Sequence, residues 1–179
     1  MIKIVKIFGV GCLFLGILYP SYYFLKGKVD NYQYEVLVDR HIEDENYYGV
    51  LVIDKIDLKR EFYPIDSKEN QVDKNILLHS SSRIPDGDGS NFIFAAHSGN
   101  GENAYFKDLY LLDIGDEVQV YYEGQIWIYE IMEIEYQDKT GILYLKEEYE
   151  DMITLITCTK NDSNTQTIYY GILKTSQNL

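Results

Sequence analysis

Positive charge is scarce in this 179-residue chain. It has 16 Lys and Arg against 29 Asp and Glu, so the formal net charge is −13, and its arginines are only Arg40, Arg60 and Arg83. Proteins that bind nucleic acid without regard to sequence need Lys and Arg to neutralise phosphates. The charge balance therefore argues against a nucleic-acid partner, while it is compatible with a cationic or amine partner.

Charge of either sign is absent from residues 7–25, and lysines flank this run on both sides. Its length is close to the roughly 20 apolar residues that span a bilayer as a helix. A cleaved signal peptide is the alternative, but no small-x-small cleavage site follows the run. We therefore predict a cytoplasmic N-terminus at 1–6, a transmembrane signal anchor at 7–25, a helical stalk or linker at 26–46, and an extracytoplasmic domain at 47–179. The protein would be a single-pass protein of the cell membrane.

Cysteine is equally scarce, with Cys12 in the N-terminal apolar run and Cys158 in the domain. A membrane-embedded Cys12 would be out of reach of the domain, so no internal disulfide is expected. A lone thiol in an extracytoplasmic domain indicates a reactive or intermolecular cysteine. The alternative is that Cys158 is a small buried hydrophobic residue.

Short apolar runs separated by turn signals predict about eight strands in the domain. Those that can be placed are expected at 49–56, 60–65, 91–96, 117–122, 125–135, 153–158 and 167–173, and the pair around Glu123-Gly124 is expected to form a hairpin. Residues 73–79 predict a helical turn, and residues 104–112 a short helix or turn that places Phe106 and Leu109 in the core. The helical patterns are too short for alternating βαβ units, so the prediction is an all-β, closed eight-stranded barrel with short helices.

Two chemically versatile residues stand at the ends of predicted buried strands. Cys158 ends residues 153–158, and His97 directly follows 91–96. A nucleophilic cysteine needs a base or an ion-pair partner, which is usually histidine. If the two strand ends meet, a Cys–His pair results; otherwise His97 is a strand-end residue bonded to its own loop. The other histidines, His41 and His79, fit a solvated and a packing position.

Metal sites are weaker interpretations of the same residues. Zinc needs three or four ligands, and only one cysteine with dispersed histidines is present in the domain. Asp86 and Asp88 alternate in a polar loop, but the further carboxylates of an EF-hand are missing. No cofactor or metal is expected.

The motifs resemble those of sortases, the membrane-anchored cysteine transpeptidases of Gram-positive bacteria. Thr-Leu-Ile-Thr-Cys at 154–158 resembles the family's Thr-Leu-x-Thr-Cys motif, and Ala-His at 96–97 resembles its histidine segment. The segments 106–109 and 115–118 resemble the Phe-x-x-Leu and Gly-Asp that follow this histidine. The resemblance covers about 49–173 and implies a sortase-like β-barrel.

The resemblance also implies a function. Cys158 would attack a sorting-signal peptide of the Leu-Pro-x-Thr-Gly kind, form a thioacyl intermediate and pass the acyl group to an amine on a cell-wall precursor or a pilin lysine. His97 would be the general acid and base. Thr157 and Lys160 are expected to help bind substrate.

One position departs from the family pattern. Sortases carry an arginine on the strand after the cysteine, and alignment on Gly171 places Gln166 there. Gln166 would then orient the carbonyl without charge, or Lys160 would compensate for the missing cation. The alternatives are a weak or inactive sortase-like module that binds peptide or scaffolds assembly, and a cysteine hydrolase with water as acceptor.

Overall fold

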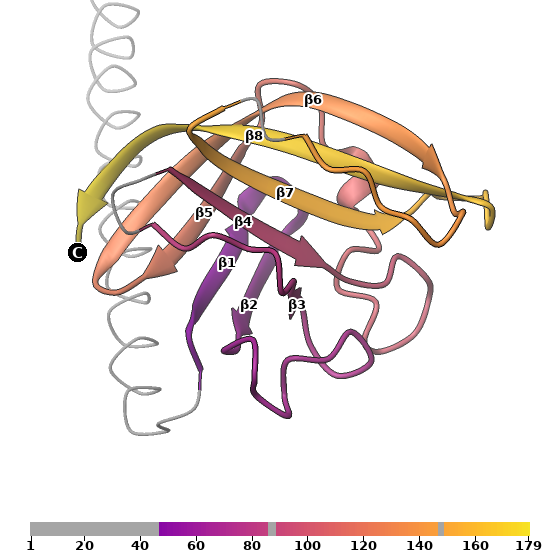
Figure 1. Ribbon diagram of the computed structural model, residues 1–179, viewed down its shortest axis with the longest axis horizontal. Helices are drawn as coiled ribbons and strands as arrows, with labels where there is room; N and C mark the ends of the chain where they lie inside the picture. The colour runs from indigo at the N-terminus through magenta and orange to yellow at the C-terminus, as the bar shows by residue number, and fades with distance from the viewer. Residues whose placement is uncertain (1–46, 86–88, 147–148) are drawn as a thin grey trace, which may run out of the picture. The chain divides into compact units, whose positions relative to one another are not determined.

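The computed structural model describes residues 47–179, apart from 86–88 and 147–148 (Figure 1). The cytoplasmic segment, signal anchor and stalk predicted at 1–6, 7–25 and 26–46 lie outside the described residues, as do Asp86 and Asp88. Among the residues that are described, no helix is long and apolar enough to cross a membrane.

Eight strands of the described region form one sheet, in the order β2-β1-β5-β6-β8-β7-β4-β3. The strands are β1 (Gly49–Ile53), β2 (Leu58–Phe62), β3 (Leu77–Leu78), β4 (Ser90–Ala95), β5 (Glu117–Tyr122), β6 (Gln125–Asp138), β7 (Asp151–Cys158) and β8 (Thr165–Asn178). Two short 3-10 helices, η1 (Asp54–Ile56) and η2 (Leu109–Leu111), complete the elements.

The sheet curls until its two edge strands approach each other. An isolated parallel bridge between Phe62, at the end of β2, and Ile76, before β3, connects the two edges. All strand pairs along the sheet are antiparallel except β4 and β7, which run parallel. The predicted all-β barrel with short helices is therefore confirmed, in a nearly closed form.

Aromatic residues fill the barrel. Phe62, Phe92 and Phe94 are fully buried and contact one another, with ring centroids 4.9 to 6.0 Å apart. Phe106 and Leu109 are also fully buried, as predicted, although only Leu109 lies in a helical element. Burial of such large rings contributes the main favourable term for a domain of this size.

A second apolar cluster lies on the other face of β4, β7 and β8. It consists of Ile93, Met152, Ile156, Ile168 and Tyr170, against which Leu143 and Leu145 of the β6–β7 connection pack. Because side chains alternate between faces along a strand, Cys158 and Ile156 share this face. The β6–β7 connection thus lies over the face on which the thiol is carried.

The helical turn predicted at 73–79 is wrong in its second half. Leu77 and Leu78 form strand β3 on the edge of β4, while the turn occurs earlier, where Asn75 N–H donates to Gln71 O. The Asn70 side chain supports β3, because it accepts from Leu78 N–H at 2.7 Å and donates to Leu78 O at 3.0 Å. Two residues are too few for a period-2 pattern to be recognised.

The first strand is also shorter than predicted. It ends at Ile53 rather than at residue 56, and η1 follows. The chain then reverses at Asp57, whose φ of 51° lies in the left-handed region. This reversal allows β2 to pair back onto β1 from Leu58.

Candidate active site

The parallel pairing of β4 and β7 brings His97 and Cys158 to the same end of the barrel. The ladder ends at the pair Ala95–Ile156, so His97 and Cys158 each come two residues later in register. Figure 1 shows the arrows of β4 and β7 running side by side in the same direction. In a parallel pair, equivalent positions after the last rung remain neighbours.

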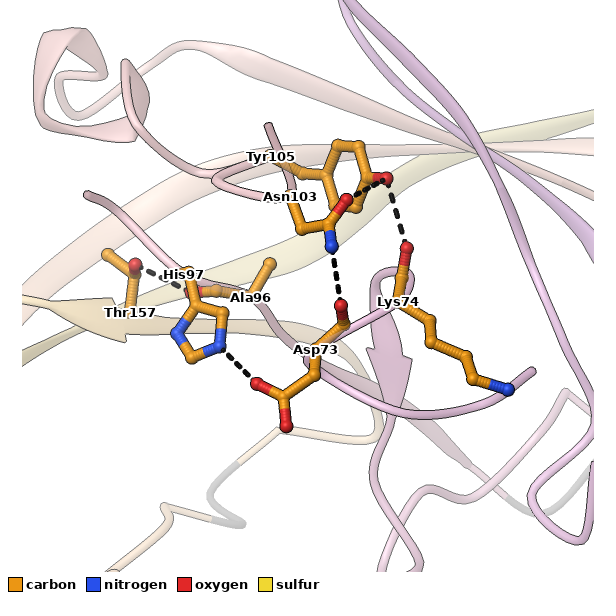
Figure 2. Close-up of polar contacts among 7 residues, drawn as sticks. All are labelled: Asp73, Lys74, Ala96, His97, Asn103, Tyr105 and Thr157. Atoms are coloured by element: carbon orange, nitrogen blue, oxygen red, sulfur yellow. Dashed lines mark hydrogen bonds and ion pairs between the residues drawn. The ribbon is translucent and has the colours of Figure 1, made fainter. Parts of the chain in front are cut away.

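Two side-chain hydrogen bonds join these strand ends beyond the ladder. The buried Thr157 hydroxyl donates to Ala96 O at 2.8 Å (Figure 2). The Ser98 hydroxyl donates to Cys158 O at 2.7 Å. These two hydrogen bonds hold the segment that carries His97 against the segment that carries Cys158. Thr157, predicted to bind substrate, directs its hydroxyl to the backbone of its neighbour strand.

The His97 ring is oriented by a carboxylate. Its Nε2 lies 3.0 Å from Asp73 Oδ1, and its Nδ1 faces away from that group (Figure 2). The His97 side chain is 45% exposed, so the ring is reached by solvent. A carboxylate partner fixes the tautomer and orientation of an imidazole.

The loop after His97 holds the Asp73 segment in place. Asn103 Nδ2 donates to Asp73 O, and the Tyr105 hydroxyl donates to Lys74 O at 3.0 Å (Figure 2). Arg60 stacks on the Tyr105 ring, with its guanidinium carbon 4.3 Å from the ring centroid. The loop that follows His97 therefore holds the backbone of Asp73 in the position from which its carboxylate contacts the His97 ring.

A lysine contacts the thiol. Lys139, the residue after β6, places Nζ 3.1 Å from Cys158 Sγ and 3.0 Å from Ser163 O. Its backbone N–H donates to Asn164 O at 2.8 Å. Cys158 itself is partly exposed. The sulfur therefore has a cationic neighbour that is held at two points by the β7–β8 loop.

The β7–β8 loop is internally braced by Asp162. The Asn164 N–H and the Thr165 hydroxyl donate to its carboxylate at 2.9 and 3.0 Å. These bonds lower the pKa of Asp162. The Asp162 carboxylate thus stabilises the β7–β8 loop, whose Ser163 and Asn164 carbonyls accept hydrogen bonds from Lys139.

His97 and Cys158 border one open cavity of about 930 Å³. Asp73, Lys139 and Lys160 also line it. The wall carries charges of both signs, so it suits a polar ligand rather than an apolar one. Within the described residues, no three His, Cys, Asp or Glu side chains gather closely enough to hold a metal ion.

The two predicted partners of the thiol occupy different places. Lys160 points its ammonium at Tyr110, with Nζ 3.2 Å from the ring centroid. Gln166 is the register partner of Cys158 on β8, so the two side chains share a face. Gln166 is half-buried and, among the described residues, does not belong to the lining of the cavity.

Sequence reasoning missed Asp73, Ser98 and Lys139. Asp73 lies 24 residues from His97, and Lys139 lies 19 residues from Cys158. Ser98 is adjacent to His97, and only the strand register shows that it reaches Cys158 O. The missed contacts depend on how loops return to the strand ends, for which the sequence carries no local pattern.

Comparisons with known proteins identify the family of the chain. The sequence matches the profile of the Sortase domain over residues 51–173, which is more than half of the chain. The chain belongs to the sortase family. Among curated proteins, no sequence match was found.

Solved structures share the fold at low identity. Sortase A of Listeria monocytogenes is 20% identical, with a TM-score of 0.62 over 75% of this chain and 91% of that one. Sortase E1 of Streptomyces coelicolor, solved with a tripeptide in its active site, is 20% identical, with a TM-score of 0.61 over 74% and 91%. The pilus island 1 sortase C2 of Group B Streptococcus is 22% identical, with a TM-score of 0.64 over 73% and 75%.

Proposed function

We propose that the protein is a cysteine transpeptidase that cleaves a sorting-signal peptide and transfers its acyl part to an amine. The observation that carries the proposal is the placement of Cys158 and His97 at adjoining ends of a parallel strand pair, where both border one cavity. Membership of the sortase family supports the same reaction.

The reaction would proceed in two acyl transfers. The Cys158 thiolate attacks the scissile carbonyl, the peptide C–N bond breaks, and a thioester on Sγ forms. His97 gives its proton to the departing amine. An incoming amine then attacks the thioester, the C–S bond breaks, and His97 takes the amine proton, as microscopic reversibility requires.

His97 is suited to this exchange by its orientation. Asp73 holds Nε2, which leaves Nδ1 as the ring nitrogen available to the amine (Figure 2). The acceptor would be an amine group on a cell-wall precursor or a pilin lysine. This amine is a cation until it loses a proton. The exposed Asp73 carboxylate, with 86% of its side chain accessible, attracts such a cation toward His97.

The peptide would enter the cavity that His97 and Cys158 border, beside the β6–β7 connection. Ile142 and Tyr144 of this connection are exposed, whereas Leu143 and Leu145 are packed on the second cluster. This alternation anchors the connection with one set of side chains and leaves the other set for an apolar residue of the peptide. Anchoring by the N-terminal segment 7–25 would keep the domain at the extracytoplasmic face of the cell membrane, near the sorting-signal peptide and the amine acceptor.

A second candidate is a sortase-like module that binds peptide or scaffolds assembly with little turnover. Gln166 favours it, because a neutral amide stands opposite Cys158 where the family pattern has arginine. A cysteine hydrolase is the remaining alternative, with water as acceptor.

Mass spectrometry with a panel of sorting-signal peptides tests the proposal. A peptide adduct on Cys158 that disappears in Cys158→Ala supports an enzyme, and its absence in the wild type across the panel favours the binding module. Adding an amine should then release an amide product; release that ignores the amine would point to hydrolysis.

His97 needs a matched control. His97→Ala should lower product formation by about 10²- to 10⁴-fold, which is the range for a general acid–base. His79→Ala removes a histidine ring whose Nδ1 accepts from Ser81 N–H at 3.2 Å within its own turn. Activity that survives His97→Ala at the level of His79→Ala would refute the assigned role.

A further inference from the structure

We propose that Lys139 supplies the positive charge of the active site, by pairing with the Cys158 thiolate and with the oxyanion that develops beside it. The pairing with the oxyanion rests on the proposed function, whereas the pairing with the thiolate is a property of the free protein. The contact that carries the proposal is the 3.1 Å separation between Lys139 Nζ and Cys158 Sγ.

Lys139 is held where it is, although its side chain is exposed. Its Nζ donates to Ser163 O at 3.0 Å, and its backbone N–H donates to Asn164 O at 2.8 Å. Two anchors on one loop restrict a side chain that would otherwise lose considerable rotamer freedom on pairing. The ammonium is thus brought to the sulfur by the fold rather than by chance contact.

Three other charged groups around the thiol are engaged elsewhere. The His97 ring is directed to Asp73 at 3.0 Å. The Lys160 ammonium lies over the Tyr110 ring at 3.2 Å. The Asp162 carboxylate accepts from Asn164 N–H and from Thr165. Among the described residues, Lys139 is the cation with a hydrogen bond to Sγ.

A cation in this place serves the chemistry twice. The thiolate is the nucleophilic form of cysteine, and a neighbouring ammonium favours it over the thiol. When the thiolate attacks a carbonyl, the negative charge moves from sulfur to the carbonyl oxygen a few ångströms away. An ammonium that is placed at the sulfur remains close to this oxygen, and charge-assisted donors stabilise such an oxyanion.

The test measures the reactivity of Cys158 without any peptide. The full-length protein and its variants, all carrying Cys12→Ala so that Cys158 is the only thiol, are alkylated with iodoacetamide, a neutral reagent, at pH 7 and low salt, and the thiolate absorbance in the ultraviolet is recorded. Lys139→Met keeps the length of the side chain and removes the charge. It should slow alkylation by about fivefold to twentyfold and reduce the thiolate absorbance.

Two variants and one condition separate charge from structure. Lys139→Arg should retain most of the rate. Lys174→Met removes an equal charge far along β8, where Lys174 pairs with Glu117 and Glu130, and should leave the rate unchanged. In the wild type, raising the salt concentration should slow alkylation toward the rate of Lys139→Met, whose own rate should respond little.

The outcomes distinguish this proposal from the proposed function. A folded Lys139→Met with wild-type alkylation and absorbance overturns the role of Lys139, whatever the peptide assay shows. If that variant does not fold, a wild-type alkylation rate that is independent of salt overturns it instead. A rate that depends on Lys139, together with no peptide adduct on Cys158, supports thiol activation and counts against the transpeptidase.

Discussion

Loss of the hydrogen bond between Thr157 and Ala96 should lower both the stability and the activity of the protein. Thr157 is 6% exposed, and its hydroxyl donates to Ala96 O at 2.8 Å. Thr157→Val keeps the shape of the side chain and removes the donor. The net value of one hydrogen bond is about 0.5–1.5 kcal/mol, and a buried carbonyl left unpaired raises the cost, so we expect a loss of about 1–2 kcal/mol.

Urea unfolding measures this loss. With a slope of about 2 kcal/mol per molar urea, the midpoint should fall by roughly 0.5–1 M. Thr157→Ser keeps the hydroxyl and should lose less than Thr157→Val. Because the bond ties the Cys158 strand to the segment before His97, adduct formation should also fall in Thr157→Val. Equal stability of Thr157→Val and the wild type, or an equal loss in both variants, would refute the reasoning.

Three further changes test the surroundings of the site. Asp73→Asn keeps a hydrogen-bonding group but removes the charge that orients His97, so transfer to amine should slow by about threefold to tenfold in a peptide assay, while thermal stability stays unchanged. Gly171→Val should destabilise by about 1–3 kcal/mol in thermal unfolding, because a Cβ at Gly171 would lie 2.8 Å from Ile153 Cγ2; the losses caused by Gly171→Val and Ile153→Ala should be less than additive in the double variant. Asp162→Asn should be less stable than the wild type at pH 7, and the difference should vanish as the pH falls through the lowered pKa of the Asp162 carboxyl, because a depressed folded pKa stabilises only above it; a difference that persists in acid would contradict this.

The parts of the fold with strong local patterns were predicted well. The β5–β6 hairpin turns at Glu123 and Gly124, whose φ values of 47° and 71° are those of a tight two-residue turn, and the sequence signals this with Gly124 between two β-branched and aromatic runs. β3 was not recognised, because its two residues become a strand only through pairing with β4. Short edge strands depend on tertiary partners, so their own sequence indicates little.

The site residues likewise differ in whether a local sequence pattern indicates them. Cys158 ends an apolar run and His97 directly follows another, so the sequence alone indicates both residues. Lys139 follows a long strand with no signal of its own. It reaches Sγ because Asp138 pairs with Thr165 at the start of β8, which folds the two loops together. A contact between two loops is fixed by the register of the strands that support them.

Gln166 and Lys139 together allow the strongest test of how this site is built. Gln166 faces Cys158 across the β7–β8 pair, so an arginine at 166 would carry its charge on the same face as the sulfur. If Lys139 already supplies the charge, Gln166→Arg alone should gain little, because two neighbouring cations repel each other. In a Lys139→Met background, Gln166→Arg should restore much of the alkylation rate and of peptide-adduct formation. The double-mutant cycle would then show a coupling well above the roughly 0.5 kcal/mol expected of independent sites. Additive effects of the two changes would mean that Lys139 and position 166 do not serve the same charge. A large gain from Gln166→Arg in the wild type would mean that the thiol lacks a cation despite Lys139.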